Sequence, residues 1–337
     1  MMEGQEVLTG VTFEDGAAEP DGELRTAHSP KLVTIVMSLT AQGMSNAAIS
    51  RHLHDVEELA VPADQVKRIS DSVVKTMEEW RTRPLSPMYP LLVVDAIHVK
   101  IRGSEVANRP VYVVLGATAE GQRDLLGFWI GEGNGESAKY WLKVLTELKN
   151  RGLRDVLFLS CDGLAGLPGA VEQVWPQTVV LRCVVHLMRR SYQLTKRNWA
   201  KVRPALMPVV TAVNAEEARQ RLDEFTADWG GQYPAVVNMW ENAWPEFIAL
   251  LEWDREIRRI LGNTNAVESV NSQIRRAVNH RRYFASEAEA LKTIYLVLRG
   301  KDHGKVRAAR WSQQWEGALN AFHLAFPDRM ILGTSPA

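Results

Sequence analysis

The chain has 337 residues, of which 46% are hydrophobic and 24% are charged, a composition typical of a globular protein large enough for two or three domains. No run of about 18 apolar residues occurs and the N-terminus has no signal-peptide pattern, so we expect a cytoplasmic protein rather than a membrane-spanning or exported one. The 40 basic residues balance the 40 acidic ones, but both are distributed unevenly along the chain.

The N-terminal region divides into an acidic segment and a helical one. Residues 1–30 contain seven acids and one arginine without periodicity, which predicts a disordered acidic tail. Residues 31–85 show three helical segments, with a tight turn at Gly43 and with Ser45 placed to cap the second helix. This pattern predicts a helix-turn-helix DNA-binding region, and three packed helices that bind no DNA are the alternative. Three polar residues lie at the start of the expected recognition helix: Gln65, Lys67 and Arg68.

An α/β region is predicted over residues 90–187, after a stiff linker that contains Pro84, Pro87 and Pro90. Apolar patterns predict three consecutive strands, then a helix, a strand, a helix and a fifth strand. The strands are expected at 91–102, 110–118, 123–131, 155–161 and 178–185, and the helices at 137–150 and about 164–175. This order predicts a ribonuclease H-like catalytic core, in which the first and fourth strands lie side by side.

The rest of the chain is predicted to be mostly helical. Residues 188–261 are expected to form an all-helical domain inserted into the core, which resumes over residues 262–310. Residues 311–337 are expected to form a C-terminal helix and tail. The tryptophans of the helical segment are predicted to lie in its core rather than to stack on bases: Trp199, Trp229, Trp240, Trp244 and Trp253. Ser286 is placed to cap a helix that follows.

Three acidic residues occupy positions that favour a shared site. Asp95 lies on the apolar face of the first strand, Asp162 ends the fourth strand, and Glu268 flanks the apolar stripe of a helix at 265–276. A buried carboxylate is costly unless it is paired, hydrogen-bonded or bound to a metal. The three acids are therefore candidate catalytic residues and ligands for two Mg²⁺ ions, with Mn²⁺ as a workable substitute.

Each acid also has a structural interpretation. Asp95 fits a satisfied core acid, and Asp162 fits a turn former before Gly163. Glu268 fits the third position of a capping box on Asn265. Similarly, Cys183 and His186 have half the spacing of a zinc site without a second pair of ligands nearby, so we expect a buried cysteine and a hydrogen-bonded histidine.

Two basic stretches are candidate DNA-contacting surfaces. Residues 173–215 contain no acid, and residues 275–310 hold ten basic residues against three acidic ones. Phosphate binding requires such local clusters, although solvated helix faces are the alternative. The candidate contacts are Arg189, Arg190, Lys196, Arg197, Arg275, Arg276, Arg281 and Arg282.

Five motifs of the chain resemble those of the Mutator-type transposases of bacterial insertion sequences. They lie at residues 83–90, 95–102, 161–168, 182–186 and 265–276, in the family's order and spacing. The resemblance implies an Asp-Asp-Glu triad at Asp95, Asp162 and Glu268 on a ribonuclease H-like fold. It also implies a Cys-x-x-His element at Cys183 and His186 that is structural or positions DNA ends.

The resemblance further implies a transposase that works on double-stranded DNA. Such an enzyme binds the terminal inverted repeats of its element, cleaves there and joins the freed 3′-hydroxyl to target DNA. We expect it at the nucleoid in the cytoplasm, as a homodimer or larger oligomer, because two ends must be held together. Two alternatives stay open: a truncated or domesticated DNA-binding derivative without catalysis, and a ribonuclease H-like nuclease.

Overall fold

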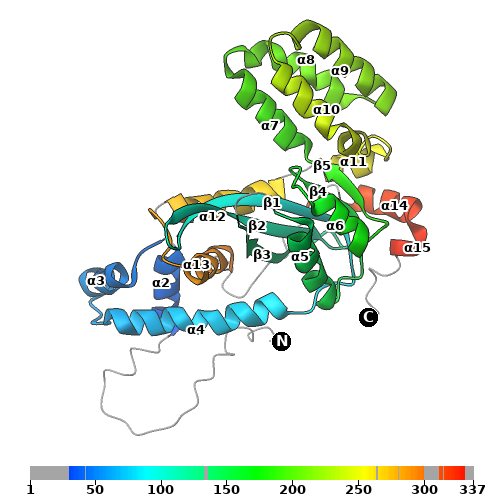
Figure 1. Ribbon diagram of the computed structural model, residues 1–337. Helices are drawn as coiled ribbons and strands as arrows, with labels where there is room; N and C mark the ends of the chain where they lie inside the picture. The colour runs from blue at the N-terminus through cyan, green and yellow to red at the C-terminus, as the bar shows by residue number, and fades with distance from the viewer. Residues whose placement is uncertain are drawn as a thin grey trace. The chain divides into compact units, whose positions relative to one another are not determined.

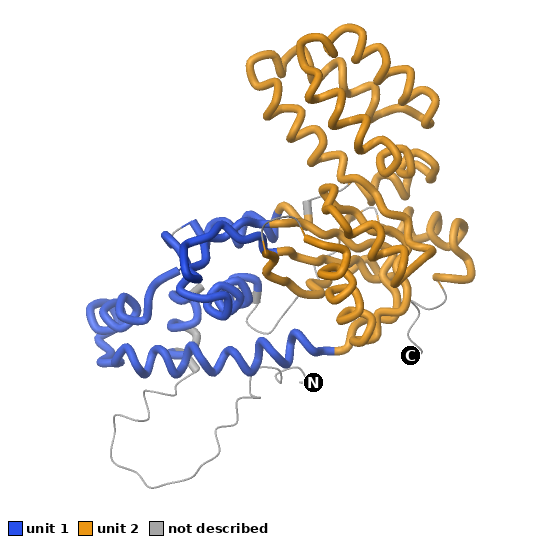
Figure 2. The backbone as a smooth tube through the Cα atoms, in the orientation of Figure 1, with its two compact units in different colours: residues 1–83, 97–111, 269–309 blue, residues 84–96, 112–268, 310–337 orange. Residues whose placement is uncertain are grey.

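The computed structural model describes residues 30–41, 43–132, 136–262, 265–279, 281–299, 311–313 and 315–330. The predicted acidic tail lies outside these residues, apart from Pro30. The chain divides into two compact units (Figure 2): unit 1 comprises residues 1–83, 97–111 and 269–309, and unit 2 comprises residues 84–96, 112–268 and 310–337. Among the described helices, none is long and apolar enough to cross a membrane.

Unit 1 is built around three N-terminal helices. They are α2 (Pro30–Ala41), α3 (Asn46–Glu57) and α4 (Ala63–Thr82). Ser45 caps α3 as expected, since its hydroxyl accepts a hydrogen bond from the backbone N–H of Ala48 at 3.2 Å. Apolar stripes of the three helices meet in one core, formed by Leu32, Val36, Leu39, Ile49, Leu53, Val61, Val66 and Ile69.

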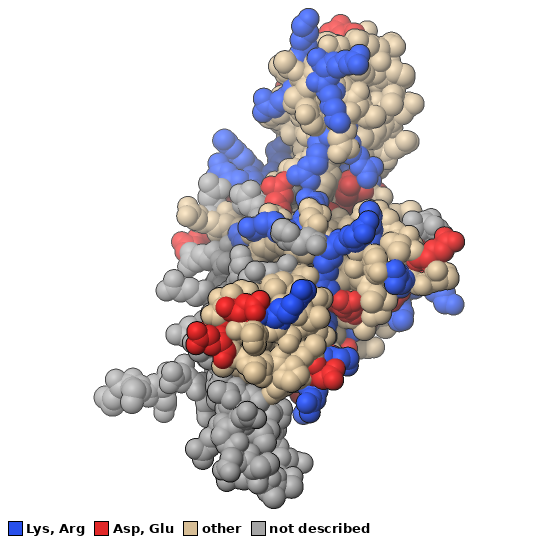
Figure 3. All heavy atoms as spheres, turned by 90° about the vertical axis from the view of Figure 1, so that its left-hand side faces the viewer, with Lys and Arg blue, Asp and Glu red and all other residues tan. Residues whose placement is uncertain are grey.

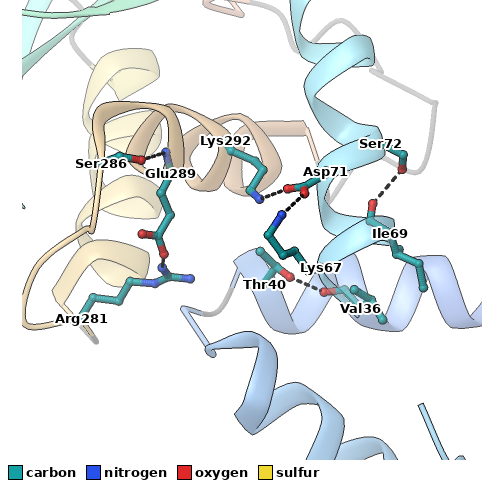
Figure 4. Close-up of polar contacts among 10 residues, drawn as sticks. All are labelled: Val36, Thr40, Lys67, Ile69, Asp71, Ser72, Arg281, Ser286, Glu289 and Lys292. Carbon is teal, nitrogen blue, oxygen red and sulfur yellow. Dashed lines mark hydrogen bonds and ion pairs between the residues drawn. The ribbon is translucent and has the colours of Figure 1, made fainter. Parts of the chain in front are cut away.

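Two further helices belong mainly to unit 1, α12 (Asn265–Asn279) and α13 (Glu287–Arg299), and α13 packs against α2 and α4. The predicted cap of α13 is confirmed, because the Ser286 hydroxyl accepts from the backbone N–H of Glu289 at 3.2 Å. An ion-pair network then joins α13 to α4: Asp71 accepts from Lys67 at 2.8 Å and from Lys292 at 3.2 Å (Figure 4).

A five-stranded sheet has the order β3-β2-β1-β4-β5 (Figure 1). Its strands are β1 (Met88–Arg102), β2 (Val106–Ala117), β3 (Arg123–Ile130), β4 (Asp155–Cys161) and β5 (Val179–Arg182). β1 pairs in parallel with β4, and β4 with β5. Short connections join β1, β2 and β3 as antiparallel hairpins, so the sheet is mixed. The prediction that the first and fourth strands lie side by side is confirmed.

Helices α5 (Ala138–Asn150) and α6 (Leu167–Val174) pack against each other and share one core with the sheet. Ser137 caps α5 by accepting from the backbone N–H of Tyr140. A second apolar cluster surrounds Phe158 of β4 and includes α14 (Trp315–Ala325) and the segment leading to α15 (Pro327–Met330). The ring of Phe158 contacts Trp253, Phe322 and Phe326 there.

Between β5 and α12 the chain forms a helical cluster with its own core. It contains α7 (Val184–Thr195), a short 3-10 helix η1 (Lys196–Asn198), α8 (Trp199–Thr211), α9 (Ala215–Trp229), α10 (Pro234–Ile248) and α11 (Arg255–Leu261). Trp240 is buried in this core, and Trp199, Trp229 and Trp244 pack against it as expected. Trp253 instead packs against Phe158, so its predicted place in the helical core is wrong.

The structure corrects several predicted boundaries. β1 begins at Met88, so Pro90 lies in the strand rather than in a linker; it is close to the strand's start, where proline is tolerated. β2 begins at Val106 instead of residue 110, and α6 at Leu167 instead of about residue 164. The fifth strand ends at Arg182 rather than at residue 185, and α7 begins at Val184.

Candidate active site

Asp95 and Asp162 come to neighbouring positions at adjacent parallel strands. Val94 of β1 pairs with Cys161, the last residue of β4; Asp95 follows Val94 within β1, and Asp162 is the first residue after β4. Asp95 is buried, and the side chain of Asp162 is 20% exposed. The pKa of the Cys183 thiol is raised to about 11, mainly by burial and also by the nearby charges of Asp95 and Asp162. Both carboxylates therefore lie near the start of α7.

Helix α7 presents three side chains to the acids. His186, Arg189 and Arg190 have the i, i+3, i+4 spacing that places residues on one helix face. Another face of α7 is fixed in the helical cluster by Leu187 and Ser191, which are fully buried. The Ser191 hydroxyl also accepts from the indole N–H of Trp240 at 3.1 Å, which holds the helix against α10.

Each of these α7 side chains contacts a different predicted catalytic acid. Arg189 donates to Oε1 of Glu268 at 2.7 Å, and Arg190 donates to Oδ2 of Asp162 at 3.1 Å. The Nε2 of His186 lies 3.7 Å from Oδ1 of Asp95, beyond hydrogen-bond distance. The three acids predicted from the sequence therefore all contact side chains of α7. Arg189 and Arg190, which were predicted to contact DNA, form ion pairs with two of these acids.

Two buried polar atoms of this cluster have no hydrogen-bond partner among the described residues. They are Oδ1 of Asp162 and Nδ1 of His186. A buried polar atom without a partner costs free energy, and such atoms are uncommon in folded proteins. We expected a hydrogen-bonded His186, but its Nδ1 has no hydrogen bond to a described residue. In Asp162, Oδ1 is the carboxylate oxygen that could accept a ligand.

Arg182 supports the turn that follows Asp162, a role that sequence reasoning missed. Gly163 has a φ of +63°, and a Cβ built there would lie 1.4 Å from Nη1 of Arg182. The Arg182 side chain is only 14% exposed, and its Nη1 lies 3.6 Å from the carboxylate of Glu246 on α10. The guanidinium thus lies directly against the turn and pairs with the helical cluster. Gly163, which directly follows Asp162, is the feature of the sequence that could have indicated a close contact at this turn.

The two cysteines are free and buried. Cys183 is the N-cap residue of α7 rather than part of a strand, and Cys161 ends β4. Burial raises the pKa of the Cys161 thiol as it does that of Cys183. Both thiols are therefore protonated near neutral pH, which is the inert form of a cysteine side chain.

Comparison with known proteins decides the family. Residues 23–307 match the model of the family described as Transposase, Mutator family. The chain belongs to the Mutator family of transposases. It is 38% identical over 299 residues to the transposase for insertion sequence element ISRM3 of Rhizobium meliloti (strain 1021), covering 88% of this chain and 74% of that protein.

Other curated relatives show the same family over most of their length. A probable transposase for an insertion sequence element of Corynebacterium diphtheriae is 34% identical over 324 residues, which cover 90% of this chain and 94% of the relative. The transposase for insertion sequence element IS256 in transposon Tn4001 of Staphylococcus aureus is 26% identical, over 79% of this chain and 69% of the relative. The predicted resemblance is confirmed.

The carboxylates of this Mutator-family chain fit a divalent cation in part. Asp95 and Asp162 offer hard oxygen ligands at neighbouring positions, the donors that Mg²⁺ prefers, and Oδ1 of Asp162 has no partner. Glu268 is instead bound to Arg189. In the part of the chain that the structure describes, no group of three or more His, Cys, Asp or Glu side chains is arranged to hold one metal ion.

The remaining candidate DNA contacts of unit 2 are exposed. Lys196 and Arg197 form the 3-10 helix that follows α7, and both side chains face solvent. Figure 3 shows Lys and Arg side chains gathered over the helical cluster at the top of the view. Exposed basic residues therefore follow Arg189 and Arg190 in the chain, beyond the end of α7 at Thr195.

The candidate contacts of unit 1 fall into two groups. Lys67 and Arg281 have acidic partners, Asp71 and Glu289 (Figure 4). Arg281 also donates to the Met44 carbonyl at 3.4 Å. The others are exposed or half-buried: Gln65, Arg68, Arg275, Arg276 and Arg282. Arg281, with a side chain 12% exposed, thus has a structural role between the start of α3 and α13.

Proposed function

We propose that this Mutator-family transposase cleaves DNA at the ends of an insertion element and joins the freed 3′-hydroxyl to target DNA. Asp95, Asp162 and Glu268 are the proposed catalytic acids. The observation that carries the proposal is the neighbouring placement of Asp95 on β1 and Asp162 directly after β4, together with the contact of all three acids to α7. Relatives named as transposases for insertion sequence elements support the reaction type.

The fold assignment belongs to the same proposal. The strand order with parallel β1 and β4 in the middle supports a ribonuclease H-like core. The separate core of α7 to α11, lying in sequence between β5 and α12, supports an inserted helical domain. The three-helix core of α2, α3 and α4 supports a helix-turn-helix region, with Gln65, Lys67 and Arg68 on the first turns of α4 as DNA contacts.

In the proposed mechanism the three acids would hold Mg²⁺, or Mn²⁺ in its place. When bound, two such cations supply Lewis acidity to the attacking and leaving oxygens of an in-line displacement at phosphorus. The side chains of the protein itself position the DNA: the basic face of α7 places positive charge beside the acids, where a phosphodiester would lie. The mechanism assigns no nucleophilic role to Cys183, whose buried thiol has a raised pKa.

The proposed partners follow from the reaction. The substrate is double-stranded DNA, both at the terminal inverted repeats of the element and at the target site. Because two ends must be held together for joining, the working form is a dimer or larger homo-oligomer. The place of action is the nucleoid in the cytoplasm.

The proposal is tested by cleavage and strand transfer on duplexes that carry the ends flanking the gene. Asp95→Asn, Asp162→Asn and Glu268→Gln each remove one charge without changing side-chain size. Loss of transition-state charge stabilisation of several kcal/mol corresponds to a rate at least about a thousandfold lower. Glu172→Gln, at an exposed acid of α6, is the matched control and should cleave at the wild-type rate.

Other results would replace the proposal with one of its alternatives. Cleavage by Asp162→Asn at the wild-type rate would remove this residue from the triad. A wild-type chain that binds the ends without cutting them, in Mg²⁺ or Mn²⁺, would be a non-catalytic DNA-binding derivative. Cleavage without any joining, even with pre-cut ends, would indicate a nuclease.

A further inference from the structure

Arg189 and Arg190 of α7 contact the acids although both side chains also reach solvent. Arg189 and Arg190 are adjacent residues, yet each binds a carboxylate from a different part of the chain, Glu268 of α12 and Asp162 after β4. Two long cationic side chains of one helix thus occupy oxygens of two of the three proposed catalytic acids.

We propose that Arg189 and Arg190 form a phosphate-binding subsite that exchanges its partners when DNA binds. In the free protein the two guanidinium groups bind Glu268 and Asp162. With DNA present they bind phosphodiester oxygens of the substrate and release the carboxylates for the divalent cation. This inference rests on the proposed function, and it adds a coupling between DNA binding and cation binding.

The exposure of the two ion pairs makes the exchange feasible. The side chains of Arg189 and Glu268 are 40% and 45% exposed; that of Arg190 is 52% exposed, although its partner Asp162 is 20% exposed. Ion pairs between exposed groups are weak, because water screens the charges and ordering long side chains costs entropy. A phosphodiester is a good competitor, since a guanidinium binds two of its oxygens in a planar, bidentate geometry.

The helix itself does not need to move. Leu187 and Ser191 are completely buried, and Ser191 is hydrogen-bonded to Trp240 in the core of the helical cluster. The side chains of Arg189 and Arg190 extend from this fixed helix, so rotation about their own bonds changes their partners. His186 is different: its side chain is 15% exposed, which leaves it little room to leave Asp95.

The guanidinium groups and a cation compete for the same oxygens. A carboxylate accepts hydrogen bonds through the lone pairs that would also bind a metal ion. Oδ2 of Asp162 is bound to Arg190, whereas its Oδ1 has no partner among the described residues. Cation affinity is therefore low while the arginines bind the acids, and it increases when phosphates bind the arginines.

The test measures Mn²⁺ binding to the full chain by calorimetry, with and without a short duplex that carries a pre-cut element end. For the wild-type chain the duplex should tighten Mn²⁺ binding at least about fivefold, the lower end of coupling between linked sites. By thermodynamic linkage Mn²⁺ should tighten duplex binding by the same factor. No effect of the duplex on Mn²⁺ affinity overturns the inference.

Removing the two arginines gives an independent test. The Arg189→Gln, Arg190→Gln double variant should bind Mn²⁺ without DNA as tightly as the wild type does with DNA, and the duplex should add nothing further. The matched control is Arg221→Gln with Arg259→Gln, which removes two exposed arginines from ion pairs on α9 and α11. This control should keep the duplex effect. A double variant of α7 that also keeps it overturns the inference.

The inference and the proposed function fail in different ways. If Asp162→Asn binds Mn²⁺ as the wild type does, the proposed cation site is wrong whatever the arginines do. If Asp162→Asn abolishes Mn²⁺ binding while the α7 variant and the duplex leave it unchanged, the cation site stands and the exchange of arginine partners is wrong.

Discussion

Gly163 places the backbone turn of the proposed active site directly against the side chain of Arg182. Its φ of +63° lies in the left-handed region, which an L-residue enters at a cost of about 1–2 kcal/mol. The same turn carries Asp162, and the Arg182 guanidinium lies where a side chain of residue 163 would begin. Arg182 in turn pairs with Glu246 of α10, which connects this turn to the helical cluster.

Gly163→Ala should lower the free energy of unfolding by more than about 1–2 kcal/mol, because the left-handed conformation alone costs an L-residue that much and the contact of the new methyl group with Arg182 adds to it. It should also displace the Arg182 side chain from Glu246 and weaken Mn²⁺ binding. Urea unfolding and calorimetry measure these two effects. Gly169→Ala is the matched control, because a Cβ at this position of α6 meets nothing within 4 Å. Alanine there should leave stability unchanged or raise it.

The contribution of Arg182 can be separated from that of the backbone. In an Arg182→Ala background the steric conflict with residue 163 is absent, so Gly163→Ala should retain only the cost of its φ angle. A substitution at Gly163 that costs the same with and without Arg182 would show that the guanidinium does not constrain the turn.

At the scale of elements, Asp71 connects α4 to α13. A hydrogen bond from Lys67 lowers the pKa of Asp71, and Lys292 lowers it further although partial burial opposes both. The same contact raises the pKa of Lys67. A carboxyl group with a lowered pKa in the folded state stabilises the fold above its unfolded pKa, and this stability is lost as the pH falls through the folded value.

Asp71→Asn should therefore destabilise the protein at pH 7 by no more than about 1 kcal/mol, the upper end for exposed ion pairs. The difference from the wild type should decrease below the ordinary aspartate pKa of 3.8, and again above the ordinary lysine pKa of 10.5 as Lys67 loses its proton. Urea unfolding across this pH range tests it. Glu79→Gln, an exposed acid on the same helix, should show no such dependence. A difference that is constant with pH would contradict the assigned network.

Local patterns predicted some elements well. The apolar run of β4 is bounded by polar residues and by Gly163, and the structure has the strand at Asp155–Cys161 as predicted. Helix α4 likewise follows its apolar stripe. The parallel neighbours β1 and β4 followed from element order, and with them the neighbouring positions of Asp95 and Asp162.

The start of α7 could not be predicted from local pattern. Val184 and Val185 continue the β-branched run of β5, which favours a strand, but packing of Leu187 into the helical core outweighs that preference. The ion pairs of Arg189 and Arg190 could not be predicted from the sequence either, because Glu268 lies 79 residues from Arg189 and Asp162 lies 28 residues from Arg190. Such contacts depend on tertiary structure alone.

At the scale of the whole molecule, a net charge of zero conceals local surfaces of one sign. Residues 173–215 contain no acid, and they include all of β5, α7, η1 and α8. Much of the positive charge at the acids is paired, as at Arg189 and Arg190, whereas Lys196 and Arg197 face solvent. We therefore expect DNA affinity to arise from local phosphate contacts, which release counterions, rather than from overall charge.

The salt dependence of DNA binding tests this expectation. Each phosphate contact contributes about 0.9 to the slope of log affinity against log salt concentration, so Lys196→Gln with Arg197→Gln should lower that slope by about 1.8 for duplex DNA. Arg221→Gln with Arg259→Gln makes the same change in net charge at ion-paired positions and should leave the slope unchanged. Equal slopes for the η1 variant and the wild type would place the DNA on another surface. Equal losses in both variants would mean that net charge, and not the basic surface after α7, governs binding.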